Sequence, residues 1–255
     1  MIFLLSLLFF SDIAVGIQGG TLAANDELPF SVFIGSCTAS LIGPQVLLTS
    51  ARCKRSGQSV AFKLDEISYS GRCEAHPQSK PNRIDFDISL CKFEPAIVNE
   101  EILARFDPNK PAVGADAYIM GFGATLDGFG SKRFAEVSVK DVGPTAFTVD
   151  GNGRVGAGDT GSSVILDTDR VRGPFIVIGV ALGLISDNLK TIAARVDNAE
   201  DFFAEFSEKN SAKICGLNSE CRGNQDICQP ERDIVQFFKD ELDSAKELLN
   251  QCLEE

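Results

Sequence analysis

Side-chain-driven acyl transfer requires three coupled groups: a hydroxyl or thiol that attacks, a base that takes its proton, and a carboxylate that orients the base. The chain offers a hydroxyl in Thr160, within the glycine-rich run 158–162, and a carboxylate in Asp87. Its single histidine is His76. Arg52 stays protonated at physiological pH and cannot accept a proton from a nucleophile. A working set would therefore depend on His76 or on an unusual base.

Other chemistries find less support in the residue types. A zinc site is weakly supported, because the chain has no Cys-x-x-Cys pair and one histidine. We expect no metal and no cofactor. The formal net charge of −12 argues against a nucleic-acid partner and against binding to an anionic membrane surface. The plainest consequence of that charge is solubility.

The first residues have the pattern of a targeting segment. Residues 2–10 are continuously apolar, but the run is too short to span a bilayer comfortably. Ala14-Val15-Gly16 fits the small-x-small pattern of a signal-peptidase site. We therefore predict a signal peptide over residues 1–16 and a secreted protein, extracellular or periplasmic, with no stable membrane span after its removal. The alternative is a buried core strand.

Cysteine usage agrees with export, because secreted chains form disulfides. The eight cysteines fall into two groups, one in the first part of the chain (Cys37, Cys53, Cys73 and Cys91) and one near its end (Cys215, Cys221, Cys228 and Cys252). The even count in each group suggests two bridges in each. Cys73 and Cys91 are expected to join neighbouring strands, but connectivity cannot be read from a sequence.

The pattern of elements changes near residue 208. Before it, short β-branched and aromatic runs alternate with turn residues, which is typical of an all-β fold. Residues 208–255 carry 11 acidic and 6 basic side chains. Pro230 is placed to open a helix, and apolar residues then recur at three- and four-residue spacing, at Ile234, Phe238, Leu242, Ala245, Leu249 and Cys252. This face would either cap the rest of the protein or bind a partner.

Seven motifs, in one order, resemble those of trypsin-like serine proteases over about residues 17–206. They are Ile17-Gln18-Gly19-Gly20, Cys37–Ile42, Val46–Cys53, Asp87–Leu90, Gly121–Gly123, Gly158–Ser162 and Val180–Gly183. The resemblance implies an all-β domain over residues 17–207, made of two packed antiparallel six-stranded β-barrels, followed by a disulfide-stapled helical extension over residues 208–255. It also implies a Cys37–Cys53 bridge, which would contribute about 3 kcal/mol in the chain-entropy model.

The resemblance assigns catalytic positions, and this chain departs from the family at two of them. Arg52 stands where the family has its histidine and Thr160 where it has its serine, whereas Asp87 keeps the carboxylate. We predict that this triad is non-functional, and that Arg52 pairs with Asp87 in the vacant site. Gly158 keeps the oxyanion-hole position. His76 matches a non-catalytic His-Pro pair of the family.

The remaining site positions also follow from the resemblance. Arg154 would lie at the base of the specificity pocket and favour an acidic side chain, and Ala181, Leu182 and Gly183 would line the cleft. The freed ammonium of Ile17 would insert beside Asp159. Because Gly16 ends the predicted signal peptide, we expect cleavage there to release Ile17 directly, without a zymogen step.

Three functions are compatible with these residues. The first is a secreted, proteolytically inactive protease homologue that binds a protein or peptide partner. The second is a hydrolase that uses Thr160 as an unusual nucleophile. The third is a structural or adhesion protein of the surface whose contacts are made by residues 208–255. The substitutions at Arg52 and Thr160 favour the first.

Overall fold

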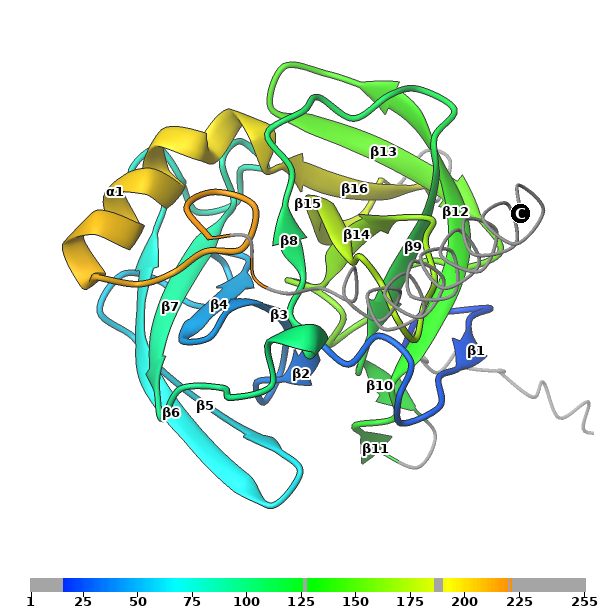
Figure 1. Cartoon of the computed structure of the whole chain (residues 1–255). Coiled ribbons are helices and arrows are strands. Elements are labelled where there is room, and N and C mark those ends of the chain that lie inside the picture. Colours follow the sequence, from blue (N-terminus) through cyan, green and yellow to red (C-terminus); the bar gives the residue numbers. More distant parts are fainter. Residues whose placement is uncertain (1–15, 126–127, 186–189, 220, 222–255) are drawn as a thin grey trace, which may run out of the picture.

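The computed structural model describes residues 16–125, 128–185, 190–219 and 221 of the chain. Within these ranges the protein is built mainly of strands, with one α-helix, α1 (Glu200–Asn210), and two short 3-10 helices, η1 (Glu100–Ile102) and η2 (Asp197–Ala199). Figure 1 shows two sheets packed side by side, with α1 at the outer edge of one of them. In the described part of the chain, no helix is both long and apolar enough to cross a membrane.

The first barrel is a six-stranded antiparallel sheet in the order β2-β3-β4-β7-β6-β5. Its strands are β2 (Ser31–Phe33), β3 (Thr38–Gly43), β4 (Val46–Thr49), β5 (Ser59–Leu64), β6 (Ile67–Ala75) and β7 (Ser89–Glu94). In β5, exposed residues alternate with buried Val60 and Phe62, the period expected of a strand with one face on a core. Because β2 lies against β5, the sheet nearly closes.

The second barrel is closed. Its six strands are β9 (Asp116–Gly121), β12 (Arg133–Val142), β13 (Ala146–Gly151), β14 (Ser163–Leu166), β15 (Ile176–Leu184) and β16 (Thr191–Arg195). The ring closes because β12 pairs with both β13 and β9. Two shorter strands attach to it: β1 (Thr21–Leu22) pairs with β12, and β8 (Arg105–Phe106) pairs with β15. A separate two-stranded sheet is formed by β10 (Ala124–Thr125) and β11 (Gly128–Phe129). The predicted fold of two antiparallel barrels is confirmed.

Apolar side chains fill both barrels and join them. Phe147 is fully enclosed in the second barrel and Phe93 in the first. Between the barrels, the rings of Phe30 and Phe175 meet with centroids 4.9 Å apart. A closely packed interior of this kind has few ways to relax.

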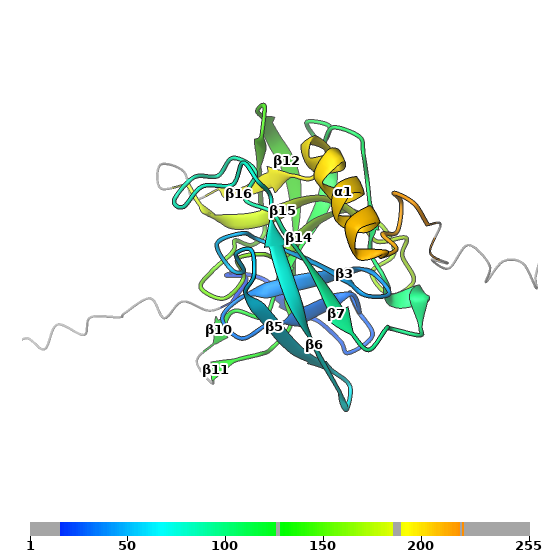
Figure 2. The ribbon, with the colours of Figure 1, turned by 90° about the vertical axis from the view of Figure 1, so that its left-hand side faces the viewer.

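Helix α1 packs its phenylalanines on the barrels and ends at Asn210, and the residue that follows, Ser211, is left-handed with a φ of 48°. In the view of Figure 2 the helix lies above β5, β6 and β7. The chain then returns to the core, where the Cys215 amide donates to the Ile42 carbonyl over 2.8 Å. Residues 211–219, assigned from sequence to the extension, are thus integrated with the barrels. The helix predicted from Pro230 to Cys252 lies outside the described residues.

The structure contains three disulfides among its described cysteines: Cys37–Cys53, Cys73–Cys91 and Cys215–Cys221. The first two are the pairs expected from the sequence. Cys73 and Cys91 are direct partners in the pairing of β6 with β7. Cys228 and Cys252 lie outside the described residues.

Candidate functional site

Asp87 and Arg52 come together at the end of the first barrel. Asp87 precedes β7 and is only 3% exposed, whereas Arg52 follows β4 and its side chain is 39% exposed. The Arg52 guanidinium pairs with Asp87 through Nε and Oδ2. The other carboxylate oxygen accepts a hydrogen bond from the Ser50 hydroxyl over 2.7 Å and one from the Arg52 amide over 3.0 Å. The ion pair predicted from the sequence is therefore present.

This arrangement leaves no proton acceptor at the Arg52 position. A guanidinium only donates hydrogen bonds, and Asp87 is already satisfied by its three donors. A second Arg52 nitrogen, Nη2, donates to the Arg83 carbonyl over 3.2 Å, which fixes the plane of the guanidinium. The carboxylate thus holds a permanent cation instead of orienting an imidazole.

Thr160 lies beside the Arg52 segment, in the turn that precedes β14. Its hydroxyl is half-buried and donates to the Leu182 carbonyl over 3.3 Å. Its own carbonyl oxygen accepts the Thr38 amide over 3.0 Å and lies 3.3 Å from the sulfur of Cys53, the neighbour of Arg52. The two segments therefore meet, but the hydroxyl is bonded to a carbonyl and not to a base.

The backbone of this turn retains free donors. Gly158 has a φ of +91°, a conformation that favours glycine, and its carbonyl accepts the Thr38 hydroxyl over 3.1 Å. Within the described residues, neither the Gly158 amide nor the Thr160 amide donates a hydrogen bond. Unpaired amides on either side of a turn residue are the type of donor that stabilises a developing oxyanion.

Asp159 is the buried centre of the same turn. One carboxylate oxygen accepts the amides of Ile17 (2.8 Å) and Gly156 (2.7 Å), and the other accepts the amide of Gly123 (2.9 Å). Burial raises the pKa of Asp159 above its ordinary value, although the three amides act in the opposite direction. In this intact chain Ile17 reaches Asp159 through its peptide N–H. The ion pair with a freed ammonium remains a prediction.

The residue before Ile17, Gly16, lies tightly against the backbone of Gly123. Gly16 is buried, and a Cβ added to it would lie 2.8 Å from backbone atoms of Gly123. Only glycine fits this close approach of the two backbones.

His76 is held by contacts with two aromatic rings. Its ring stacks on Phe86 at 4.6 Å and meets Phe202 edge-on at 5.1 Å. Its Nδ1 accepts the Gln78 amide over 3.2 Å. Burial lowers the pKa of His76, against the opposing charge of Glu205. No contact of His76 with Thr160 is present in the described residues.

The positions expected to form the specificity pocket lie in one strand, β15, and in a loop. Arg154 is fixed through its backbone, which exchanges hydrogen bonds of 2.7 and 2.9 Å with Gln18. Ala181 and Leu182 are buried in β15, and Gly183 follows them with a φ of +159°. Leu182 contributes to the core and supplies its carbonyl to Thr160.

Sequence reasoning missed a cavity of about 400 Å³ beside the Arg52–Asp87 pair. Arg55 and Lys80 line it together with Arg52, Asp87 and His76. The run Arg52-Cys53-Lys54-Arg55 indicates local positive charge, because three of its four residues are basic. Lys80 lies in a separate loop, and nothing in the sequence shows that the two loops face each other.

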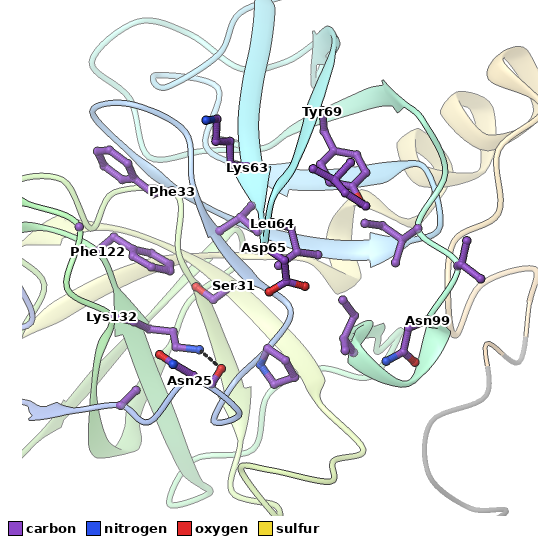
Figure 3. Close-up of a pocket in the computed structure, with 18 of the residues that line it drawn as sticks. Asn25, Ser31, Phe33, Lys63, Leu64, Asp65, Tyr69, Asn99, Phe122 and Lys132 are labelled. Carbon is purple, nitrogen blue, oxygen red and sulfur yellow. Dashed lines mark hydrogen bonds between the residues drawn. The ribbon is translucent and has the colours of Figure 1, made fainter.

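A larger hollow, of about 950 Å³, lies away from these positions, between the barrels. Figure 3 shows Phe33, Leu64 and Phe122 around it, with the Lys132 ammonium near Asn25. The Lys132 ammonium donates to the Asn25 carbonyl over 3.3 Å. Exposed apolar side chains also line it, namely Leu22, Ile67 and Val98. No pattern in the sequence indicated this surface.

Comparison with known proteins places these features in a family. The family model described as Trypsin matches residues 17–203. No curated protein matches the sequence.

Proposed function

Because the chain belongs to the trypsin family, we propose that it is a secreted, proteolytically inactive member that acts by binding a protein or peptide partner. The observation that carries this proposal is the pairing of Arg52 with Asp87. The base position holds a guanidinium, which keeps its charge at physiological pH and has no lone pair to offer a proton. Loss of one triad member typically lowers turnover by about 10⁴ to 10⁶.

The Thr160 hydroxyl supports the same proposal. It donates to a carbonyl, and its neighbours Asp159 and Gly161 are tied into the barrel by backbone and carboxylate hydrogen bonds. Activation of a hydroxyl needs an acceptor within hydrogen-bond reach. We expect a binding cleft that derives from an enzyme to keep the backbone of this turn while its hydroxyl is no longer activated.

Secretion is part of the proposal. Three disulfides in the described chain are favoured in an oxidising compartment. The predicted signal peptide, residues 1–16, lies outside the described residues apart from Gly16.

A second candidate, hydrolysis by Thr160 with unusual activation, has one observation in its favour. The unpaired amides of Gly158 and Thr160 could still stabilise an oxyanion. A water molecule would then have to take the proton that the missing imidazole would accept.

The test is labelling of the oxidised, mature protein with a fluorophosphonate probe of serine hydrolases. We expect the native chain and Thr160→Ala to be equally unlabelled. The double substitution Arg52→His with Thr160→Ser should gain labelling, because it supplies both missing groups beside Asp87. Ser162→Ala, which removes a nearby buried hydroxyl without a hydrogen-bond partner, is the matched control in that background and should not reduce labelling.

Labelling of the native chain that disappears in Thr160→Ala would refute the proposed inactivity and establish the hydrolase. The third possibility, surface contacts made by the extension, is addressed by removing residues 222–255. The deletion begins there because the segment from Ser211 to Cys221 contributes to the core. If this truncated chain keeps partner binding, the barrels make the contacts.

A further inference from the structure

We infer that the cavity beside Arg52 is a recognition site for carboxylate side chains of an acidic peptide segment. This inference rests on the proposed binding function and names the class of ligand. The cavity, of about 400 Å³, lies between two loops of the first barrel, one carrying Arg52 and Arg55 and the other Lys80.

The charges that face the cavity are predominantly positive. Arg52, Arg55 and Lys80 contribute three cations, and Asp87 contributes one carboxylate that is engaged by Arg52. His76 also lines the cavity, and its lowered pKa leaves the imidazole mainly neutral at pH 7. This local excess of positive charge contrasts with the net charge of −12 of the whole chain.

Two of the three cations have no hydrogen-bond acceptor or ion-pair partner in the part of the chain that the structure describes. Arg55 and Lys80 are exposed, and neither side chain donates a hydrogen bond or forms an ion pair among the described residues. Arg83, by contrast, is already paired with Asp85 at the edge of this region. Arg55 and Lys80 are thus available to a ligand that reaches the cavity.

The loop that carries the arginines is held in place. Cys53 is bonded to Cys37, the Arg55 amide donates to the Gln58 side chain over 2.7 Å, and the Cys53 amide donates to the Ser50 carbonyl over 3.0 Å. A cation on an ordered loop loses less conformational freedom on binding than one on a loose loop.

Carboxylate is the anion that fits these features best. A guanidinium presents a planar fork of donors that matches a carboxylate, and a neighbouring ammonium adds a point charge. The cavity has room for one or two side chains, not for an extended chain of anions. An extended polyanion would also be repelled by the remaining surface, since the pI is about 4.6. A short acidic stretch of a polypeptide meets both conditions.

Fluorescence polarisation of the full-length oxidised protein tests the inference. The probe is a fluorescein-labelled hexapeptide with two central glutamates between alanines, and the matched peptide has glutamine in their place. We expect the glutamate peptide to bind more tightly at low ionic strength and to weaken as salt is added. Arg55→Glu and Lys80→Glu should each weaken it by about threefold to tenfold.

Lys110→Glu is the matched control. Lys110 is exposed, does not line the cavity, and its reversal changes the net charge by the same amount. If Lys110→Glu weakened binding as much as Arg55→Glu, the effect would come from overall charge and the inference would be wrong.

The outcomes separate this inference from the proposed function. Equal binding of both peptides, insensitive to Arg55→Glu and Lys80→Glu, would overturn the carboxylate site but leave the binding function standing. Cleavage of the peptides would overturn the proposed inactivity. The KM values of Arg55→Glu and Lys80→Glu for the glutamate peptide, each divided by that of the native chain, would then still measure how far the cavity recognises carboxylates. Absence of binding by either peptide, or tighter and equally sensitive binding of a heparin hexasaccharide, would overturn the acidic-peptide assignment.

Discussion

The guanidinium of Arg52 is bonded to the carboxylate of Asp87, which also accepts the Arg52 backbone amide. One residue thus engages both oxygens of the carboxylate, through its side chain and its main chain. In an active triad that carboxylate would orient a neutral base. Here it is the buried anchor of a half-exposed cation, and the cation faces the cavity at which we expect ligand binding.

The first prediction concerns the stability of this pair. Asp87→Asn should lower the free energy of unfolding by about 1–3 kcal/mol, because three donors lose a charged acceptor in a buried place. Arg52→Gln should cost less, about 1 kcal/mol, because its exposed side chain is screened by solvent and Asp87 keeps the Ser50 hydroxyl. Urea unfolding measures both. Asp26→Asn, on the surface, is the control, and an equal effect at Asp26 and Asp87 would contradict the role given to the pair.

The second prediction uses the pH dependence of Asp159. In the intact chain its pKa is raised by burial, so the folded state binds a proton more readily than the unfolded state. Between the unfolded value near 3.8 and the higher folded value, stability should therefore fall as pH rises. Urea unfolding across this window should show the slope in the intact chain and a flatter profile in Asp159→Asn.

The change of unfolding free energy with pH also distinguishes a chain that begins at Ile17 from the intact chain. A free ammonium beside Asp159 would favour the carboxylate and lower its pKa. The stability that this ion pair contributes would then be present above the pKa of Asp159 in the unfolded chain, and it would be lost as the pH falls below that pKa. We expect this opposite sign for the chain cut after Gly16. Identical slopes in the intact and cut chains would show that the ammonium does not reach Asp159.

A third prediction tests the packing around Thr160. Gly161 has a φ of +89°, and a Cβ added there would clash with the Thr49 hydroxyl and lie 2.5 Å from the Thr38 carbonyl. Gly161→Ala should therefore cost several kcal/mol, about 1–2 for the left-handed backbone and the rest for the clash. Gly114→Ala is a close control, since Gly114 has a φ of +86° but nothing within 4 Å of the added Cβ. Thermal unfolding of the two variants should separate backbone strain from crowding.

A fourth prediction concerns processing. N-terminal sequencing of the mature protein should begin at Ile17, because the predicted signal-peptidase site ends at Gly16. A start at any other residue would rule out direct release of Ile17. Gly16→Leu should impair folding of any chain that retains residue 16, because Gly123 leaves no room for a side chain.

The tail could be assigned only in part from its sequence. Helix α1 (Glu200–Asn210) lies across the end of the segment that resembles the family, residues 17–206. The boundary predicted at residue 208 does not mark the end of contact with the barrels, because Cys215 exchanges backbone hydrogen bonds with Ile42 and Phe106. Composition cannot reveal such contacts, since the donors and acceptors lie more than 100 residues apart.

Local patterns in the chain were enough to establish the fold class and the order of the family motifs. Strand-length runs, turn residues, and an arginine and a threonine at named places are all visible without knowledge of distant contacts. The resemblance to the family also indicated the Cys37–Cys53 bridge. The inability of Arg52 to act as a base needs no coordinates, because it is a property of the guanidinium itself.

The surroundings of those residues, in contrast, are a property of the folded chain. Lys80 lies across a cavity from Arg55, His76 is enclosed between Phe86 and Phe202, and the Thr160 hydroxyl is turned toward Leu182. Each of these depends on which loops meet when the strands close into barrels. Distances between loops are set by the packing and register of strands that are remote in the chain, and no local pattern contains that information.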